Sequence, residues 1–564
     1  MPSWRSAAVA PVRSRQGQGA ALVLLGLAML TAAAVLLDYG SGLTWFQDSW
    51  EFLINRRDPS AAALFDPHNE HIVVVPVLIQ EALLRIFGMD SMTPELVVLV
   101  ALLLATAALV FVYVRRRLGP WPALMAAVGL LFLGPAWQDL LWPFQINFVG
   151  SAMCGVGVLL ALESERRRAD LLAAVLLVLS VGFSSLGLAF AVAAAVDVFQ
   201  RRRERGLGRL WVVAAPLVFY AAWYAGWGHD AETNLSAHNV LVSPRFVVEG
   251  LAASLDALLA LATIFDEAVG RSDWALALLV VLAGLVAYGA YRGRRFDPRL
   301  WPALAAAATF WFLAAFNSIP GREAYSSRYL YVGALFTLLI GANLLQGLRP
   351  QRWVLALAGA ATVAIAVLNL TPLREGRDFF ASQTVLTRAD LGAIEIAADS
   401  VEPEFALPPE IAGTSFLNEI RAGEYLQAVE EYGSPAYTPG ELAGAAEDGR
   451  RQADIVLANA LPLGIETGAE PAAEGGACVE VRGSSEARPL LLRPGTTTVE
   501  LPPGGPGAIR LRRFGRAGYP LSTEGVAAAS TTRLFIPRDR APQRWRLLVE
   551  AGQGATVCRA PAGQ

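Results

Sequence analysis

Residues suited to chemistry gather near the start of the chain, where acids alternate with aromatic side chains. Asp48 and Glu51 lie in a run that also holds Trp45, Phe46 and Trp50. A carboxylate held near an apolar boundary can act as a general base toward a hydroxyl acceptor. Asp48 is therefore the first candidate for a catalytic base, and Glu51 could share that role. The alternative is a solvated acid or helix cap beside an aromatic belt.

A second polar run follows at residues 67–71 and combines imidazole, amide and carboxylate groups: Pro67, His68, Asn69, Glu70 and His71. We interpret His68, Asn69 and His71 as substrate contacts, and Glu70 as a third candidate acid for catalysis. Imidazole and carboxylate also suit divalent cations, so Asp48, His68 and His71 are an alternative Mg or Mn site if the reaction depends on such an ion. The sequence specifies no other cofactor. A structural alternative begins a helix at Pro67, with both histidines on one face.

Two arginines stand out in the stretch 317–329, on the side of the predicted membrane where few basic residues are expected. A guanidinium binds phosphate in a bidentate manner, so Arg322 and Arg328 are candidates for holding a phosphate group. Tyr329 follows directly and is a further candidate contact. The alternative is an ion pair with Glu323 or with acids of the first external loop. The stretch 228–273 is a candidate cover for a substrate cavity.

These residues require a membrane scaffold to position them. Hydrophobic residues make up 54% of the 564 positions and charged residues only 17%, which excludes a mostly water-soluble globule. All 46 basic residues are arginine, and a net charge of -3 argues against a general nucleic-acid binder. A chain without lysine indicates a GC-rich genome. It also excludes a phosphate-binding loop that uses lysine.

A membrane span needs about 20 mostly apolar residues, and arginines collect on the cytoplasmic side. About eleven stretches qualify: 20–37, 94–114, 120–137, 146–162, 170–183, 185–199, 209–227, 274–291, 300–317, 329–347 and 353–370. If the spans alternate strictly, every arginine cluster is cytoplasmic, the N-terminus lies inside and the C-terminus outside. Ile72–Phe87 is short and contains a proline and two charges, so we interpret it as an interfacial helix on the outer face.

The C-terminal third has a different character. We predict a transmembrane domain over 1–370 and an extracytoplasmic domain over 371–564, mixed or helical in 371–470 and a β-sandwich in 471–564. Its short strands include Trp545–Val549 and Thr556–Cys558, separated by a turn at 552–554. Cys478 and Cys558 fall in its first and last strands, and a disulfide between them is physically sensible on an outward-facing domain. Cys154 lies in a span and is interpreted as a packing residue.

The membrane half, about residues 20–370, resembles the GT-C superfamily of glycosyltransferases that use polyprenyl-phosphate sugars. The resemblance rests on an acid after the first span (Asp48), a long external loop whose interfacial helix ends in Phe87-Gly88, and an arginine cluster followed by Leu-Gly at 115–119. The runs at 67–71 and 327–329 resemble those of uncharacterised bacterial members. One departure is that many members carry two adjacent acids at the catalytic position, whereas here Glu51 comes three residues after Asp48.

The resemblance implies an integral-membrane enzyme in the bacterial inner membrane. Asp48 would deprotonate the acceptor hydroxyl. A hexose or pentose, such as mannose or arabinose, would leave an outer-leaflet polyprenyl phosphate with inversion, and Arg322 or Arg328 would hold the departing phosphate. The acceptor would be an envelope glycan, lipid or protein. The C-terminal sandwich resembles carbohydrate-binding modules in outline.

Two other functions remain open. A lipid or glycan transporter or flippase would favour charged residues within spans and repeat symmetry, which the sequence does not show. A non-catalytic glycan-binding membrane scaffold would not need the acids and histidines beside the membrane face.

Overall fold

Helices form at each of the apolar stretches that hydropathy identifies. The computed structural model describes residues 15–57, 60–205, 208–268, 271–412, 417–467, 477–484, 489–500, 507–520 and 531–559. The helices at the predicted spans are α1 (Arg15–Gly40), α5 (Thr93–Leu118), α6 (Pro120–Leu131), α8 (Ile146–Leu162), α9 (Arg167–Phe183), α10 (Gly187–Gln200), α12 (Leu210–Gly226), α15 (Asp273–Tyr291), α16 (Leu300–Phe316), α17 (Ser327–Leu344) and α18 (Arg352–Leu368).

Five helices in the described part of the chain are long and apolar enough to cross a membrane, or six if the bent pair Pro120–Leu131 and Gly134–Leu141 is one span. Length and composition therefore identify a helical, multi-pass membrane protein. Several other helices, such as α10, α12 and α16, are apolar but shorter. The count of eleven spans and the orientation of the chain stay predictions.

The other helices of the described residues are α2 (Ser49–Asn55), α3 (Ala61–Phe65), α4 (Val74–Phe87), α7 (Trp137–Leu141), α11 (Arg202–Arg205), α13 (Ala237–Leu259), α14 (Leu261–Phe265), α19 (Leu370–Ile396), α20 (Pro409–Ala412), α21 (Ala422–Tyr432), α22 (Pro439–Gly444) and α23 (Glu447–Ala460). Short 3-10 turns lie at Gly134–Ala136, Pro143–Gln145, Gly228–Asp230 and Leu417–Glu419. The expected interfacial helix is α4. Helix α19 continues the chain directly beyond α18.

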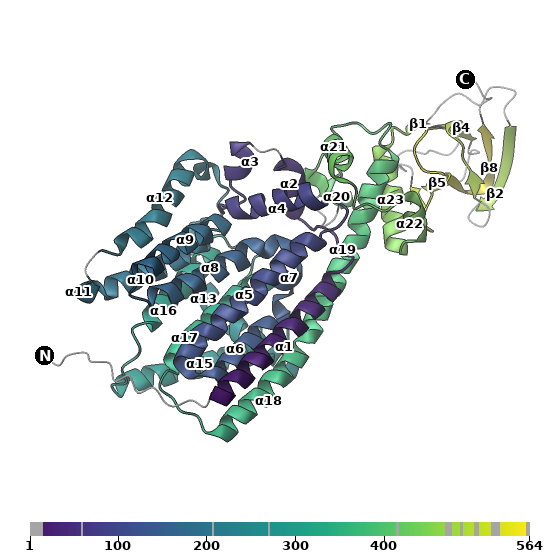
Figure 1. Cartoon of the computed structure of the whole chain (residues 1–564). Helices are drawn as coiled ribbons and strands as arrows, with labels where there is room; N and C mark the ends of the chain where they lie inside the picture. The colour runs from purple at the N-terminus through teal and green to yellow at the C-terminus, as the bar shows by residue number, and fades with distance from the viewer. Residues whose placement is uncertain are drawn as a thin grey trace. The chain divides into compact units, whose positions relative to one another are not determined.

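The chain divides by its internal contacts into two units, and the predicted domain boundary at 370 stays a prediction. The first comprises residues 1–41, 58–80 and 93–378, and the second comprises 42–57, 81–92 and 379–564. Within the first unit, α5 packs against α1, α6 and α8, and α13 packs against α16 and α17 (Figure 1). The second unit thus takes two segments from the predicted external loop, one of which holds Asp48.

Aromatic and backbone contacts join these segments to the rest of the second unit. Trp50 packs edge-on against Tyr425 of α21, with ring centroids 6.5 Å apart. The backbone N–H of Met89 donates to the carbonyl of Tyr432, at 2.6 Å. A Cβ at Gly88 would lie 2.6 Å from that same carbonyl oxygen, and Gly88 has a φ of 74°, so both the contact and the conformation favour glycine here.

The C-terminal strands form one hydrogen-bonded, antiparallel sheet in the described residues, ordered β1-β7-β4-β8-β5-β6, with β2 and β3 also paired to β8. The strands are β1 (Gly464–Thr467), β2 (Ala477–Ser484), β3 (Leu490–Leu491), β4 (Gly495–Glu500), β5 (Gly507–Arg512), β6 (Tyr519–Pro520), β7 (Thr531–Ile536) and β8 (Arg546–Arg559). These strands confirm β structure in the C-terminal part, while its division into two packed sheets stays a prediction.

Strand β8 corrects one expectation, because the two strands predicted at 545–549 and 556–558 are a single strand of 14 residues. The register jumps opposite the predicted turn: Val481 pairs with Ala555, but Gly483 pairs with Ala551. Residues 552–554 are therefore extra residues of a bulge, which glycines accommodate without ending the strand. Cys478 and Cys558 lie opposite each other in β2 and β8 and are joined by a disulfide.

Helix α23 is fixed to the sheet by one buried carboxylate. Asp454 accepts backbone N–H groups from Arg513, Phe514 and Gly515, each at 2.9 Å. Burial raises the pKa of Asp454 above its usual range, although these three donors act against that shift. Asp454 therefore has a structural role, because its carboxylate provides the hydrogen-bond acceptor for the backbone N–H groups that follow β5.

Candidate functional site

The run at 67–71 forms a tight turn, so the interpretation of a helix beginning at Pro67 is wrong. The backbone N–H of His68 donates to the carbonyl of His71 at 3.0 Å, and the reverse bond is 2.9 Å. Asn69 adopts a φ of 49°, a left-handed conformation that asparagine tolerates better than most residues. Helix α4 begins only at Val74. The turn exposes the polar side chains of Asn69 and Glu70 in a fixed geometry.

Apolar helices of the first unit hold this turn in place. The indole Nε1 of Trp223, in α12, donates to the carbonyl of Phe65 at 2.7 Å, just before the turn. The hydroxyl of Ser185, between α9 and α10, donates to the backbone oxygen of Glu70 at 3.2 Å. The ring of His68 lies edge-on to Phe144, and the ring of His71 lies edge-on to Phe148 at the start of α8.

Arg322 pairs with this turn, as one of the two alternatives from the sequence anticipates. Its Nη1 lies 3.4 Å from Oε2 of Glu70, and its Nη2 donates to Oδ1 of Asn69 at 3.2 Å. The side chains of Arg322 and Glu70 are only 18% and 20% exposed, so water screens the pair weakly. The carboxylate of Glu70 would therefore compete with a phosphate for the Arg322 guanidinium.

His71 lies against the same carboxylate, with its Nε2 at 3.5 Å from Oε1 of Glu70. Burial lowers the pKa of His71 below its ordinary value, and the nearby charges of His68 and Arg322 act in the same direction. The carboxylate of Glu70 opposes this shift only in part. The imidazole is therefore neutral at neutral pH and can accept or donate a hydrogen bond without carrying charge.

A cavity of about 180 Å³ opens beside the turn. Its polar lining combines four side chains from the predicted runs at 67–71 and 317–329 with two that the sequence did not single out. The four are Glu70, His71, Asn317 and Tyr329, and the two are Ser185 and Tyr220. Apolar side chains such as Phe148 and Phe310 complete the wall. A small, mostly apolar cavity with a few convergent polar groups is typical of a binding site for a small molecule.

Arg328 lies at the start of α17, beside Tyr329, and forms no hydrogen bond or ion pair with the described residues. Its Nε is buried. The fully buried Asp139 of α7 interacts with Arg328 electrostatically. Ser327 fixes the same helix start, because its hydroxyl donates to the carbonyl of Pro135 at 2.8 Å and accepts the N–H of Gln138 at 3.1 Å. Arg328 therefore keeps donors that a phosphate could use.

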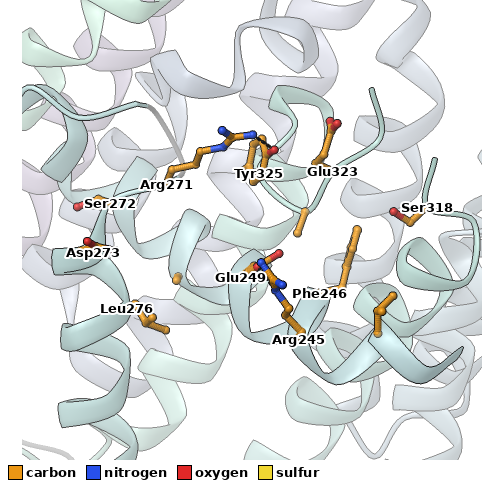
Figure 2. A pocket seen from close by; sticks show the side chains of 13 residues that line it. Arg245, Phe246, Glu249, Arg271, Ser272, Asp273, Leu276, Ser318, Glu323 and Tyr325 are labelled. Atoms are coloured by element: carbon orange, nitrogen blue, oxygen red, sulfur yellow. Dashed lines mark hydrogen bonds and ion pairs between the residues drawn. The ribbon is translucent and has the colours of Figure 1, made fainter. Parts of the chain in front are cut away.

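A larger cavity, of about 640 Å³, is lined by residues of α13, by the start of α15 and by the loop before α17 (Figure 2). Figure 2 shows Arg245 beside Glu249 on α13, and Arg271 reaching over to Tyr325. The Arg271 guanidinium lies 4.2 Å from the centre of the Tyr325 ring and also hydrogen-bonds to its hydroxyl. Residues of the stretch 228–273 line part of this cavity, and its occupation by a substrate stays a prediction.

The loop before α17 contributes to both cavities. Asn317 and Tyr329 line the smaller one, and Ser318 and Glu323 line the larger one. Phe246, from the wall of the larger cavity, packs edge-on against Tyr329 with ring centroids 6.5 Å apart. The N–H of Gly321 is the largest of several contacts that lower the pKa of Glu323, which keeps that carboxylate ionised in this loop.

Asp48 and Glu51 belong to the second unit, whereas the other candidate residues belong to the first. Asp48 is half-buried and precedes α2, but its side chain does not cap that helix. Glu51 is engaged by Arg56, whose Nε and Nη2 lie 3.1 and 2.8 Å from Oε1. The indole of Trp50 donates to the carbonyl of Trp45 at 3.1 Å, which orders the aromatic run around Asp48.

Within the described part of the chain, no group of three or more His, Cys, Asp or Glu side chains is placed to hold a metal ion. The polar lining residues that the sequence did not single out are Ser185 and Tyr220. Ser185 lies between α9 and α10 and Tyr220 lies within α12, and no local motif distinguishes either from a packing residue.

Comparison with known proteins gives little further guidance. No protein-family model and no curated protein matches this sequence. Among solved structures, the chain is similar to the crystal structure of ArnT from Cupriavidus metallidurans bound to undecaprenyl phosphate, with a TM-score of 0.48 and 12% sequence identity. The match covers 79% of this chain and 96% of that one.

Proposed function

We propose that this chain is an integral-membrane glycosyltransferase that moves a sugar from a polyprenyl-phosphate donor to an envelope glycan, lipid or protein. The observation that carries the proposal is the cluster of Arg322, Asn69, Glu70 and His71 beside a cavity of about 180 Å³ in a unit made of apolar helices. The sequence resemblance to GT-C glycosyltransferases supports the same chemistry.

The cluster supplies the groups that such a reaction needs at its phosphate end. The departing polyprenyl phosphate carries negative charge, which a guanidinium stabilises through two parallel hydrogen bonds. Arg322 would bind the phosphate in place of Glu70. Arg328 would add further N–H donors, which form no hydrogen bond with the described residues. His71, Asn69 and Tyr329 would contact the sugar or the phosphate through hydrogen bonds.

Asp48 is the proposed general base, on the basis of the sequence resemblance and its place in an aromatic run. It would accept the proton of the acceptor hydroxyl as the oxygen attacks the anomeric carbon, and the bond from that carbon to the phosphate oxygen would break with inversion. Glu51 is the weaker candidate, because Arg56 already engages it. The outer face of a bacterial inner membrane, with the second unit extracytoplasmic, is the proposed location.

The test uses the purified full-length chain, a panel of synthetic polyprenyl-phosphate pentoses and hexoses, and a crude envelope extract as acceptor. The readout is the release of polyprenyl phosphate by the native chain and by Asp48→Asn and Glu70→Gln. Glu81→Gln is the matched control, because it also removes a Glu–Arg ion pair near the turn but in α4.

Release by the native chain and by Glu81→Gln, together with a loss of about 100-fold or more in Asp48→Asn, is the expected result for a general base. If Asp48→Asn keeps its rate and Glu70→Gln loses it, the base is Glu70. If the native chain turns over no donor, the proposal fails, and a transporter or a glycan-binding scaffold takes its place.

A further inference from the structure

A basic cavity separate from the proposed active site lies where α15 ends, α16 begins and α17 ends. The cavity has a volume of about 230 Å³. Its lining combines two arginines with amide side chains: Arg294, Arg295, Asn343 and Gln346, together with Phe296, Asp297 and Leu344. All of these residues belong to the first unit.

The acids around these helix ends are already neutralised by other arginines. Glu163 lies 2.6 Å from Arg116, 2.7 Å from Arg117 and 3.9 Å from Arg299. Asp297, which lines the cavity, lies 3.8 Å from Arg299 and also accepts the backbone N–H of Arg299 at 2.8 Å. Among the described residues, Asp297 is thus the one carboxylate that lines the cavity, and Arg299 shares it.

Arg294 and Arg295 form no ion pair with any residue that the structure describes. Arg294 donates from Nη2 to the carbonyl of Leu344 at 2.7 Å, which holds its guanidinium at the end of α17. Arg295 is exposed and has no such contact. The side-chain oxygen of Gln346 is buried without a hydrogen-bond partner. Two arginines therefore share a cavity whose lining includes a single carboxylate, Asp297, which a third arginine also contacts. The resulting excess of positive charge favours an anion as the occupant.

The side chains around this cavity indicate where that anion comes from. Tyr291, at the end of α15, is 86% exposed, and Trp301, at the start of α16, is 55% exposed. Leu345 and Leu348 are also exposed. Exposed Tyr and Trp side chains at the ends of apolar helices mark the interface between lipid and water. Basic pockets between such helices bind the headgroups of anionic lipids.

We propose that this cavity binds the phosphodiester headgroup of an anionic glycerophospholipid. Arg294 and Arg295 would hold the phosphate oxygens, Gln346 would face the polar part of the headgroup, and the acyl chains would lie along the exposed apolar surface of α15 and α16. Binding would tie the ends of α15, α16 and α17 together through the lipid. The site does not depend on the transferase activity proposed above.

The test measures lipid binding by the purified full-length chain in a neutral detergent. The probes are dioctanoyl-phosphatidylglycerol, dioctanoyl-phosphatidylcholine and inorganic phosphate, and the readout is the shift in thermal unfolding temperature across a titration. The variant is Arg294→Gln with Arg295→Gln. The matched control is Arg292→Gln with Arg349→Gln, which removes the same charge from exposed arginines that do not line the cavity.

We expect phosphatidylglycerol to stabilise the native chain, with an affinity on the order of tenfold weaker in the cavity variant and unchanged in the control pair. Equal weakening in both pairs would show attraction to general surface charge and overturn the proposal. If inorganic phosphate binds as tightly as phosphatidylglycerol, the site binds a free anion. If phosphatidylcholine binds as tightly as phosphatidylglycerol, the negative charge of the headgroup plays no part. Either result overturns the assignment to an anionic lipid.

Because Arg294 also bonds to α17, its replacement removes a structural contact as well as a charge. Arg295→Gln alone avoids that contact and gives a second measurement. An unfolding temperature that matches the native chain without lipid, combined with a reduced shift in phosphatidylglycerol, would support the proposal. If phosphatidylglycerol shifts the unfolding temperature of both the single and the double variant as much as that of the native chain, the proposal is refuted.

Discussion

Arg322 lies 3.4 Å from Glu70, although 252 positions separate the two residues in the chain. The same guanidinium reaches Asn69, and the same carboxylate faces His71. The positive charge that a phosphate would need is thus neutralised from within the protein in this arrangement. In the proposed reaction, the donor phosphate would therefore compete with Glu70 for Arg322.

The Arg322–Glu70 pair should contribute to stability as well as to binding. We expect Glu70→Gln and Arg322→Gln each to lower the free energy of unfolding by about 1–3 kcal/mol, because each leaves the other charge half-buried without its partner. Since the two losses share one interaction, the double variant should lose less than the sum. Denaturant unfolding of the four chains measures this coupling, and strictly additive losses would contradict it.

Acidification should destabilise the first unit through His71. Its pKa is lowered in the folded chain, so the folded state binds fewer protons than the unfolded state, in which a histidine titrates near 6.5. The stabilisation that comes from keeping His71 neutral is fully present above about pH 6.5. It is lost as the pH falls through the lowered pKa of His71 in the folded chain. Unfolding temperatures at pH 7.5 and 5.5 test this. Between these two pH values, the unfolding temperature of His71→Gln should fall less than that of the native chain. The control His238→Gln, at an exposed residue, should show the same fall as the native chain.

Removing the disulfide should weaken the sheet of the second unit. The bond closes a loop with a sequence separation of 80, and cross-links of this kind typically contribute about 2–4 kcal/mol by restricting the unfolded chain. We expect Cys478→Ser with Cys558→Ser to unfold the second unit at lower denaturant. Adding reductant to Cys154→Ala should reproduce the effect, since that chain keeps only the paired cysteines. No change in either experiment would argue against a stabilising bridge.

Asp454 should be among the most sensitive positions of the second unit. Asp454→Ala leaves three buried backbone N–H groups without their acceptor, and we expect a loss of roughly 2–4 kcal/mol. Asp448→Asn, an exposed position on the same helix, is the matched control and should unfold like the native chain. Limited proteolysis of the segment after β5 reports the same change, and equal protection in all three chains would contradict this role.

The positions of the membrane helices could be predicted because hydropathy is a local property. Each apolar stretch identified in the sequence contains a helix, and the expected edges of α5 and α8 differ from the observed ones by a few residues at most. The turn at 67–71 was harder, because Pro67 is a common first residue of a helix. Its true conformation depends on the backbone bonds between His68 and His71 and on packing against α8, which lies far along the chain.

The candidate site could be predicted only in part for the same reason. Glu70, His71 and Tyr329 carry visible chemistry and line one cavity. Ser185 and Tyr220 complete the lining, but only the folding of distant segments brings them there. In the sheet, glycines at 552 and 554 resemble a turn, and the pairing with β2 makes them a bulge instead. Local sequence cannot distinguish the two without knowledge of the partner strand.

The second unit's composition affects the order in which the protein can fold during its synthesis. Residues 42–57 and 81–92 emerge from the ribosome before residues 93–378, yet their partners begin at 379. At about 5–20 residues per second, Tyr425 is synthesised roughly 20–75 s after Trp50. During that interval the aromatic side chains around Asp48 lack their final neighbours. The nascent chain must therefore shelter them against the lipid interface or a chaperone until translation reaches the last third of the sequence.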